Sequence, residues 1–434
     1  MTRRADARNE TYPHKKMSVS STANISPVHG GLDQPVNRLV EGVDAEWSKL
    51  AVIDVNEIDR TTLYRIADGT LSPLNGPMTE SDYKNVLRKA AIERNGKWWA
   101  WGIPTILPVS NDEAEKCKIG DTLALAYEGQ IFGTIKVRSV YEWDKANFIQ
   151  SCYGTDRTDH PGAGLWLGDD RTMLVGGEIS LAPFKDEREF AHRVLSPLET
   201  RKLIEEKGWE QSIGFQTRNP LHRAHEYALV YGAEVILREN GRKTGVILNP
   251  LVGQLKGDDV PAATRMKTYV TLVEDHFLGM GDKDEELWKE KGQNFDEAVA
   301  LIGLDMRMYY GGPREAIMHA IYRQNCGFTH FIIGRKHADA PFADGTAIWG
   351  DFDAQEVFDK LEGELAIKTV NVGFAAFFEE LGRVGLVKEN KDKTSVNISG
   401  TKMREILGAG ELPDERVMRP STAKILGEYY QSKK

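Results

Sequence analysis

One segment of the chain, residues 216–225, concentrates polar groups that could act on an anion. It reads Gln-Thr-Arg-Asn-Pro-Leu-His-Arg-Ala-His. His222 and His225 would share one face of a helix, where both can donate to phosphate oxygens. Arg218 adds a planar fork of N–H donors that fits a tetrahedral oxyanion. The neutral donors beside it are Gln216, Thr217 and Asn219. Donors aimed at growing negative charge are what phosphoryl or nucleotidyl transfer requires, so this segment is the candidate site.

Parts of this segment have simpler explanations when they are considered singly. A histidine pair on a helix can be ordinary core residues, because histidine is a residue of intermediate burial. The pair could also bind a metal ion, but no third ligand follows nearby, so we expect no metal site. The chain has no GxxxxGK[ST] sequence, which disfavours a Walker-type kinase or ATPase. The run as a whole is much more specific than any of its parts.

The candidate segment lies between a predicted strand, Ser212–Phe215, and a predicted helix, Leu221–Glu239, whose first turn accepts Pro220. The N-terminus of a helix presents free N–H groups and the positive end of its dipole, which attract phosphate. Further strands are predicted at Thr244–Val252, Asp305–Tyr310 and His330–Ile333, and helices at Thr264–His276 and Pro313–Gln324. This alternation predicts a parallel α/β sheet that binds its ligand at the carboxyl ends of the strands.

The rest of the chain predicts additional regions around this sheet. From about Leu50 to Leu181, short apolar runs broken by Gly, Asp and Asn indicate a β-rich, barrel-like domain with a helix at Ser81–Ile92. The charged stretch Glu187–Glu206 has helical spacing. Near the C-terminus, helix-like spacing predicts core positions at Phe374, Phe377 and Phe378.

We therefore expect an α/β multidomain chain with four parts. These are a mobile N-terminal tail (1–26), a β-rich N-terminal domain (27–190), a Rossmann-like α/β nucleotidyltransferase domain (191–360) and a small C-terminal α/β domain (361–434).

Composition limits the class of protein. The formal charge is −9, with 41% hydrophobic and 28% charged residues, which is typical of a globular chain. The acidic balance disfavours a nucleic-acid partner. A membrane partner is also not expected, since no apolar run approaches the roughly 18–20 residues of a membrane helix. Cys117, Cys152 and Cys326 are far apart and odd in number, which predicts free buried thiols and a reducing, cytoplasmic location.

Taken together, these motifs resemble those of the ATP sulfurylase (sulfate adenylyltransferase) family. The run at 216–225 resembles the family's active-site motif, and Tyr310–Ala316 resembles its YAGPREA segment. The similarity covers about residues 27 to 430. The other similar segments are Ser72–Gly76 with Met78–Glu80, His160–Gly162, Val175–Gly177, Asn249–Gly253 running on to Lys256–Asp258, and Ile398–Thr401 with Arg404.

The resemblance implies the reversible reaction of ATP with sulfate to give adenylyl sulfate and pyrophosphate, by in-line attack of sulfate on the α-phosphate of MgATP. Sulfate would be held by Arg218 and Arg335, and the leaving pyrophosphate would be stabilised by His222 and His225. The catalytic residues that it implies are Thr217, Arg218, Asn219, His222, His225 and Arg335. The substrate-binding residues are Gln216, Arg218, Asn219, Gly334, Arg335, His337 and Ala338.

The resemblance also implies the partners of the protein. Mg²⁺ would arrive with ATP and be held mainly by the phosphates, as is usual for this ion. The chain would form a homodimer or a larger homo-oligomer, and it would act in sulfur metabolism, such as sulfate assimilation.

One loop departs from the family's pattern. Where the usual sequence is GRDHAG, residues 334–339 read Gly-Arg-Lys-His-Ala-Asp, a net gain of one positive charge that suits anionic substrates. If Asp339 keeps the backbone angles of the glycine that it replaces, we expect strain there. Two rival functions follow. Another adenylyltransferase is disfavoured because an arginine beside amide donors suits a small tetrahedral oxyanion. A non-catalytic nucleotide or sulfate sensor is disfavoured by the intact run at 216–225.

Overall fold

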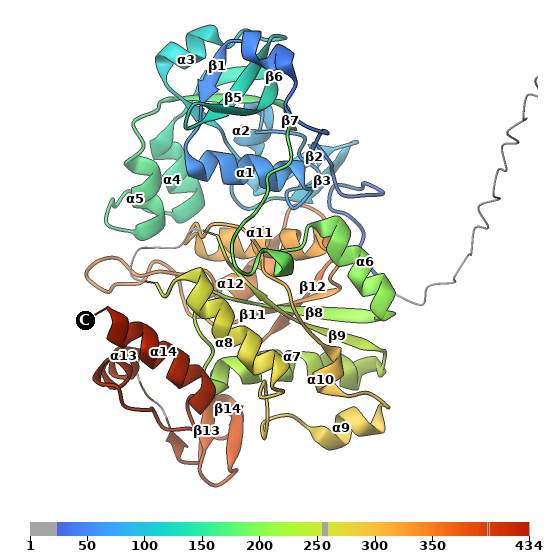
Figure 1. Ribbon diagram of the computed structural model, residues 1–434, viewed down its shortest axis with the longest axis vertical. Helices are drawn as coiled ribbons and strands as arrows, with labels where there is room; N and C mark the ends of the chain where they lie inside the picture. Colours follow the sequence, from blue (N-terminus) through green and yellow to red (C-terminus); the bar gives the residue numbers. More distant parts are fainter. Residues whose placement is uncertain (1–23, 254–258, 397, 399, 434) are drawn as a thin grey trace, which may run out of the picture.

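The computed structural model describes residues 24–253, 259–396, 398 and 400–433. A β-rich region at one end, an α/β sheet in the middle and a small C-terminal region beside that sheet make up the molecule (Figure 1). The mixed α/β fold with a β-rich N-terminal part is therefore confirmed. Most of the predicted tail lies outside the described residues. Of its last residues, Ser26 is buried and donates its N–H to the carbonyl of Gly327 at 3.1 Å.

The N-terminal region is built on a five-stranded sheet of order β1-β5-β6-β7-β4. Its strands are β1 (Val52–Asp54), β4 (Pro108–Val109), β5 (Thr122–Tyr127), β6 (Gln130–Glu142) and β7 (Met173–Leu181). Only the β1–β5 pair is parallel. The order ends at β1 on one side and at β4 on the other, so the barrel-like domain that we expected is a half-barrel sheet. A separate antiparallel hairpin joins β2 (Ala91–Arg94) to β3 (Lys97–Ala100).

Helices of the N-terminal region cover this sheet, and several begin at capping residues that their sequence supplies. Asn56 and Asp59 form a reciprocal capping box at the start of one helix, as do Ser110 and Glu113 at another, which satisfies N–H groups that the helix cannot pair. The helices are α1 (Glu57–Ala67), α2 (Glu80–Lys89), α3 (Asn111–Lys116), α4 (Lys145–Tyr153) and α5 (Pro161–Leu167), with a 3₁₀ turn at Ala45–Lys49.

The middle region holds a five-stranded parallel sheet of order β10-β9-β8-β11-β12, which confirms the predicted α/β architecture. Its strands are β8 (Gln211–Thr217), β9 (Thr244–Pro250), β10 (Val299–Leu301), β11 (His330–Ile333) and β12 (Lys368–Asn371). Every residue of β9 is buried, as expected for a strand covered on both faces. Its helices are α6 (Pro197–Lys207), α7 (Arg223–Asn240), α8 (Ala262–Glu274), α9 (Glu285–Glu290), α10 (Phe295–Ala298), α11 (Gly312–Asn325) and α12 (Asp353–Glu356), with 3₁₀ turns at Ala191–Arg193 and Val357–Lys360.

The C-terminal region consists of a small antiparallel sheet of order β14-β13-β15 and two helices that pack on each other. Its elements are β13 (Ala375–Phe378), β14 (Arg383–Leu386), a 3₁₀ turn (Val387–Glu389), β15 (Ser395–Val396), α13 (Gly400–Ala409) and α14 (Pro420–Ser432). Figure 1 shows these elements, in red and orange, beside α7 and α8 of the middle region.

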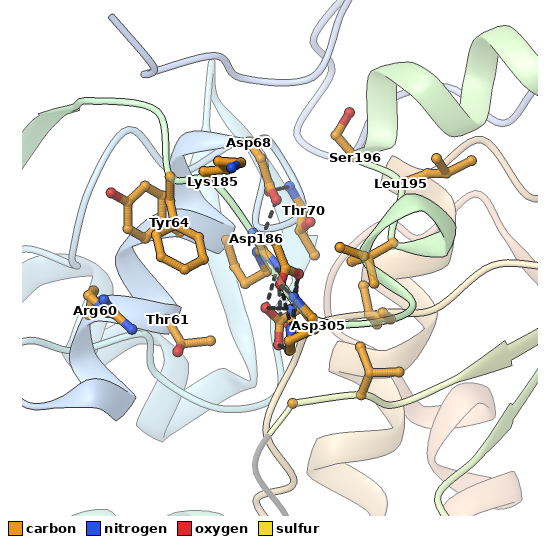
Figure 2. Close-up of a pocket in the computed structure, with 18 of the residues that line it drawn as sticks. Arg60, Thr61, Tyr64, Asp68, Thr70, Lys185, Asp186, Leu195, Ser196 and Asp305 are labelled. Atoms are coloured by element: carbon orange, nitrogen blue, oxygen red, sulfur yellow. Dashed lines mark hydrogen bonds and ion pairs between the residues drawn. The ribbon is translucent and has the colours of Figure 1, made fainter. Parts of the chain in front are cut away.

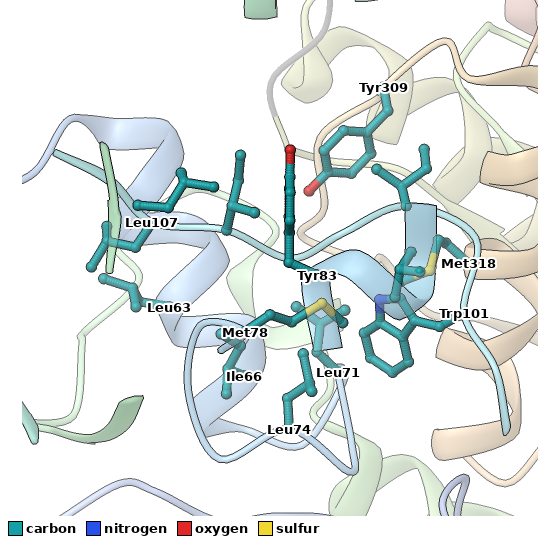
Figure 3. Packing of buried hydrophobic residues seen from close by; sticks show 14 of the residues in the cluster. Leu63, Ile66, Leu71, Leu74, Met78, Tyr83, Trp101, Leu107, Tyr309 and Met318 are labelled. Atoms are coloured by element: carbon teal, nitrogen blue, oxygen red, sulfur yellow. The ribbon is translucent and has the colours of Figure 1, made fainter. Parts of the chain in front are cut away.

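A single hydrophobic core joins the N-terminal region to the middle one. Figure 3 shows Tyr309 and Met318, which flank and belong to α11, packed with Tyr83 and Trp101 of the N-terminal region. Two backbones also meet at a glycine, since a Cβ on Gly102 would lie 1.8 Å from the carbonyl oxygen of Arg314. The start of α11 is therefore held from two sides, by its own sheet and by the N-terminal region.

Three local predictions from the sequence are wrong. The expected strand at 305–310 does not form. Strand β10, beside β9, forms that edge of the middle sheet instead. Tyr310 takes a left-handed φ of 54°, which an extended strand does not allow. The helix expected from Glu187 begins only at Pro197, where Ser196 caps it. Phe377 and Phe378 are buried as predicted, but they lie in strand β13 rather than on a helix, and Phe374, just before that strand, is 50% exposed.

One expected boundary also needs correction. Residues 368–371, which we expected beyond the edge of the middle domain, form β12 and pair with β11. The sequence indicates a strand beyond residue 361, but we assigned it to the C-terminal domain because a long segment with only short helices separates it from β11.

Candidate active site

The candidate segment begins at the carboxyl end of β8 and leads into the first turn of α7. Thr217 closes a small turn, because its hydroxyl donates to the carbonyl of Asn219 at 2.9 Å and accepts the Asn219 N–H at 3.2 Å. The hydroxyl of Tyr269 donates to the same carbonyl at 2.8 Å. The turn is thus fixed by side chains that belong to β8 and α8, and it aims the following residues at the edge of the sheet.

His222 and His225 stack on each other at the start of α7, with ring centroids 3.8 Å apart and planes inclined by 23°. His222 is the N-cap residue, yet its side chain caps no N–H group of the helix. The Nδ1 atoms of both rings are buried without a hydrogen-bond partner. Burial lowers the pKa of His222 to about 4. Burial, and then the neighbouring ring, lowers the pKa of His225 well below 6.5. Both imidazoles are therefore neutral near pH 7.

The opposite side of the same helical turn is charged and fully paired. Arg223 donates to the Asp282 carboxylate at 2.9 and 2.6 Å, and Arg419 donates to Glu226 at 3.0 Å and to Asp282 at 3.4 Å. All four side chains are buried. The carboxylates also accept N–H groups from Gly279 and Val384. This network, which we call the α7 charge cluster (Arg223, Glu226, Asp282, Arg419), fixes the turn that presents the two histidines.

Arg218 and Gln216 also hold polar atoms without partners. The Nη1 atom of Arg218 is buried with no hydrogen bond, and its guanidinium lies 4.9 Å from the ring centroid of Tyr310. The Oε1 atom of Gln216 is likewise buried without a partner. An unpaired buried polar group costs about 1–3 kcal/mol, so several such atoms at the end of one strand indicate a site prepared for a polar ligand.

The start of α11 contributes residues that the sequence analysis did not select. Glu315 is fully buried, and its carboxylate accepts the N–H groups of Tyr309 at 2.8 Å and Gly311 at 3.0 Å. The Nε2 atom of His319 lies 3.2 Å from Glu315 Oε1. The Nδ1 atom of His319 lies 3.1 Å from Gln216 Nε2 and 2.9 Å from His337 Nε2. The pairing of Glu315 with His319, one helical turn apart, was the signal available in the sequence.

The loop after β11 holds the remaining predicted site residues. Arg335 donates to the Asp351 carboxylate at 2.9 Å and stacks 4.2 Å above the Phe374 ring. Its contacts therefore lie apart from those of the Gln216–His319–His337 group. Ala338 has a left-handed φ of 57°, and its carbonyl accepts the N–H of Gly312 at 3.1 Å. Gly334 precedes this turn, and a Cβ added to it would contact nothing within 4 Å.

The two residues that differ from the family's usual loop sequence, Lys336 and Asp339, do not produce the backbone strain that we considered at Asp339. Asp339 is not among the residues with positive φ, so the glycine-like strain that we expected at this position does not occur. The left-handed non-glycine residues of the loop are Lys336, at 49°, and Ala338. Lys336 is tied to Asp351 through its backbone N–H and by an ion pair at 3.7 Å.

The structure thus brings Gln216, Arg218 and His337 together around α11, and it stacks His222 on His225 at α7. Thr217 and Asn219 build the turn between these groups. Some motif residues fall outside the described chain, namely Lys256–Asp258 and Ser399. Arg314 of the Gly-Gly-Pro-Arg segment donates to the carbonyls of Val86, Leu87 and Gly102, so it anchors α11 rather than facing a ligand.

A pocket of about 1000 Å³ lies elsewhere, between α1, the linker after β7 and α6 (Figure 2). Two of its arginines pair with carboxylates of the lining. Arg65 lies 2.9 Å from Asp68, and Arg188 lies 2.8 Å from Asp305. These two guanidinium groups therefore have carboxylate partners, whereas the Nη1 atom of Arg218 at the end of β8 has no hydrogen bond.

The described residues contain neither a cluster of metal-binding side chains nor a membrane-spanning helix. Within residues 24–253, 259–396, 398 and 400–433, no three His, Cys, Asp or Glu side chains gather as a metal site. Within the same part of the chain, no helix is long and apolar enough to cross a membrane. The three cysteines are buried free thiols.

Comparison with known proteins identifies two matching regions. A family model described as ATP-sulfurylase matches residues 191–429, and one described as a PUA-like domain matches residues 25–183. The chain is 64% identical over 414 residues to a sulfate adenylyltransferase of Pyropia yezoensis, covering 95% of this chain and 98% of that protein. It is 34% identical over 421 residues to a sulfate adenylyltransferase of Synechococcus sp. (strain JA-3-3Ab), covering 95% and 98%.

Two further matches are longer than this chain. A probable bifunctional SAT/APS kinase 2 of Sorangium cellulosum is 37% identical over 417 residues, which cover 94% of this chain and 66% of that protein. Among solved structures, a hexameric APS kinase from Thiobacillus denitrificans superposes with a TM-score of 0.68 at 18% identity. The match covers 93% of this chain and 69% of that one, and it supports the fold alone.

Proposed function

Because this chain belongs to the ATP-sulfurylase family, we propose that it is a sulfate adenylyltransferase that uses the carboxyl edge of β8 as its active site. The reaction joins sulfate to the α-phosphate of ATP and releases pyrophosphate, and it is reversible. The observation that carries the proposal for the site is the set of buried, unpaired polar atoms on Gln216, Arg218, His222 and His225. Arg218, His222 and His225 can donate from these atoms, and a doubly charged oxyanion beside a triphosphate supplies the acceptors that would pair with them.

The chemical step requires positioning more than proton transfer. Sulfate is already an anion near pH 7, so its oxygen attacks the α-phosphorus without a general base. The protein holds the two anions in line and stabilises the charge that passes to the leaving pyrophosphate. Arg218 supplies the guanidinium for sulfate, supported by the Gln216 side chain. Thr217 and Asn219 keep the turn against which the transferring phosphate lies.

The histidine pair acts as neutral donors toward the leaving pyrophosphate. With both imidazoles neutral, each ring carries one N–H that can donate to a phosphate oxygen. A neutral pair avoids the repulsion that two imidazolium ions would suffer at a centroid distance of 3.8 Å. Their stacked arrangement on the paired turn of α7 keeps both rings at the positive end of the helix dipole.

The loop of residues 334–338 completes the proposed substrate site. Arg335 reaches sulfate by exchanging its ion pair with Asp351, which is exposed enough to be weak. Gly334 and Ala338 contribute backbone to the loop, and the N–H of Ala338 is the proposed donor. His337 supports the loop through His319.

Magnesium fits this site only as a companion of the nucleotide. The described residues offer no cluster of three metal-binding side chains, so ATP phosphates would hold Mg²⁺ with most of its water. When bound, the ion neutralises part of the phosphate charge.

The remaining proposals concern the assembly. The chain functions as a homodimer or larger homo-oligomer in the cytoplasm, in sulfate assimilation or related sulfur metabolism. Its parts are a tail up to about residue 26, a β-rich domain to about 190, a catalytic domain that includes β12, and a small C-terminal domain. Buried free thiols are in keeping with a reducing compartment. Light scattering of the purified protein and fractionation of its source cells test these two points.

The proposed activity is tested by ATP formation from adenylyl sulfate and pyrophosphate, followed by luminescence. Robust ATP production supports the proposal. A folded protein that binds ATP but produces none from this pair contradicts it and favours a sensor. Adenylyl transfer to another acceptor, such as a mononucleotide, in place of sulfate favours the other adenylyltransferase.

A further inference from the structure

We propose that Glu315 and His319 of α11 are positioning residues for sulfate, because together they orient the Gln216 amide, the Arg218 guanidinium and the loop that carries His337. This inference rests on the proposed function and names residues that it does not use. Neither side chain is exposed, and each has its polar atoms engaged by neighbours in the site. Their contribution is therefore to hold other groups rather than to touch substrate.

The Glu315 carboxylate first shapes the segment beneath Arg218. It accepts the N–H groups of Tyr309 and Gly311, the residues on either side of Tyr310. Tyr310 between them has the left-handed φ of 54°, which is unfavourable for a residue with a bulky side chain. The two hydrogen bonds to Glu315 offset that strain and keep the Tyr310 ring under the Arg218 guanidinium. Without the carboxylate, this support of Arg218 is lost.

Glu315 also fixes the proton position on His319. Above pH 7, where Glu315 is ionised, its carboxylate only accepts hydrogen bonds, so His319 carries its proton on Nε2, which faces Glu315 at 3.2 Å. Burial lowers the pKa of His319 well below 6.5, so the ring holds a single proton. Its Nδ1 atom is then an acceptor.

The acceptor on His319 decides how two neighbours are oriented. Gln216 points its amide nitrogen at His319 Nδ1 at 3.1 Å, which turns its oxygen, Oε1, elsewhere. His337 presents Nε2 to the same atom at 2.9 Å, so its proton is also on Nε2 and the two donors share the single lone pair of His319 Nδ1. The chain of contacts from Glu315 through His319 therefore sets one orientation for the amide and one for the loop of residues 334–338.

The test compares His319→Phe, which removes both hydrogen-bonding atoms, with His319→Gln, whose amide keeps one donor and one acceptor. We expect His319→Phe to raise KM for sulfate at least tenfold and to change KM for ATP less than twofold. We expect His319→Gln to recover at least part of the loss. Glu315→Gln, which puts an NH₂ group against N–H donors, should raise KM for sulfate in the same way.

Matched controls separate positioning from general packing. His29→Phe removes another fully buried histidine, whose Nε2 lies 2.8 Å from the Ala100 carbonyl in the N-terminal region. Glu234→Gln changes another buried carboxylate that accepts the Asp284 N–H at 2.7 Å. Both controls are expected to leave the two KM values unchanged, even where they lower the melting temperature.

The outcomes distinguish this inference from the proposed function. An active wild-type protein whose His319 and Glu315 variants keep the wild-type KM for sulfate overturns the inference and leaves the function standing. Equal changes in KM for both substrates, or equal losses in His319→Phe and His319→Gln, also overturn it, since they indicate a structural role. A wild-type protein without activity on sulfate overturns both.

Discussion

Helices α7 and α11 both begin at the carboxyl edge of the same sheet, and both place a titratable pair in the first turns. The two pairs differ in whether their polar atoms have hydrogen-bond partners. His222 and His225 of α7 stack with their Nδ1 atoms buried and unpaired, whereas Glu315 and His319 of α11 have their polar atoms engaged by backbone and side chains. A fold tolerates unpaired buried groups where a ligand completes them, and saturated groups serve to hold their neighbours. This difference supports our proposals that the first pair meets substrate and that the second pair positions the residues that bind it.

The largest expected effect concerns Arg218, which connects the two helices. Arg218→Ala removes the guanidinium between the α7 segment and Tyr310, and we expect kcat to fall by about 1000-fold, or about 4 kcal/mol. Steady-state kinetics of adenylyl sulfate conversion measures it. Arg138→Ala is the control, because that arginine pairs with Glu178 on the exposed surface of the N-terminal sheet. A variant that keeps more than about a tenth of wild-type kcat contradicts the role.

The next largest effect is a loss of stability, caused by breaking ion pairs in the α7 charge cluster. Arg419→Met leaves Glu226 and Asp282 of the α7 charge cluster with one cation between them, so we expect a loss of about 3 kcal/mol in the free energy of unfolding. Urea denaturation measures it. Arg416→Met is a matched control, because its pair with Asp414 is partly exposed and should contribute less than about 1 kcal/mol. Equal losses in the two variants would show that burial of the cluster does not matter.

A third change separates activity from stability at a single residue. His222 is the N-cap of α7 but caps no N–H group, and asparagine is among the best N-cap residues. We expect His222→Asn to lower kcat about 100-fold, or about 2.7 kcal/mol, and to raise stability by about 1 kcal/mol. Activity and thermal unfolding are measured on the same sample. A fall in both would mean that the ring is structural.

The two helices are also expected to respond oppositely to pH. Burial lowers the pKa of His222 to about 4, so its contribution to stability is fully present above pH 6.5 and is lost as the pH falls through 4. Burial raises the pKa of Glu315 from 4.5 to about 7, so its contribution is present below pH 4.5 and is lost as the pH rises through 7.

Unfolding free energies from pH 4 to 8 for wild type, His222→Asn and Glu315→Gln check this difference. Relative to wild type, the first variant should gain stability as the pH falls below 6.5. The second should gain stability as the pH rises from 4.5 to 7. Shifts of the same sign in both variants would contradict the comparison.

The smallest expected effect is at Lys336, one of the two residues at which the loop of residues 334–339 differs from the usual GRDHAG sequence. Lys336 has a left-handed φ, which asparagine and aspartate adopt more readily, and its ion pair with Asp351 is partly exposed. Lys336→Asp should therefore change stability by less than about 1 kcal/mol. We also expect KM for sulfate to change less than threefold. A tenfold rise would show that the lysine contributes directly to anion binding.

The sequence predicted the parts of the site that depend on local pattern. A strand before residue 216, a helix after Pro220 and the parallel alternation could be derived from periodicity and turn residues, and the histidine pair from its spacing. What it could not predict depends on contacts between distant segments. Glu315 was missed because its partners are the backbone N–H groups of Tyr309 and Gly311. The strand predicted at 305–310 does not form for a related reason, since the N–H of Tyr309 pairs with Glu315 rather than with a neighbouring strand.

The pairing of Arg335 with Asp351 is a second contact that the sequence could not predict, here for a residue that the sequence did select. Residue type and family pattern predict an arginine for sulfate, but nothing in the spacing indicates that a carboxylate 16 residues later holds it first. The boundary after residue 360 failed similarly, because an edge strand is defined by its neighbour rather than by its own four residues.

The hydrophobic core shared by Trp101, Tyr309 and Met318 has a consequence for how the molecule melts. Two family models divide the chain, at 25–183 and 191–429, yet the segment that supports Arg218 is packed on both sides of that division. Heating should therefore unfold the two parts in one calorimetric transition, with equal calorimetric and van't Hoff enthalpies. During evolution, a substitution in the core of the β-rich part is therefore expected to affect the proposed active site as well, because the two share this core.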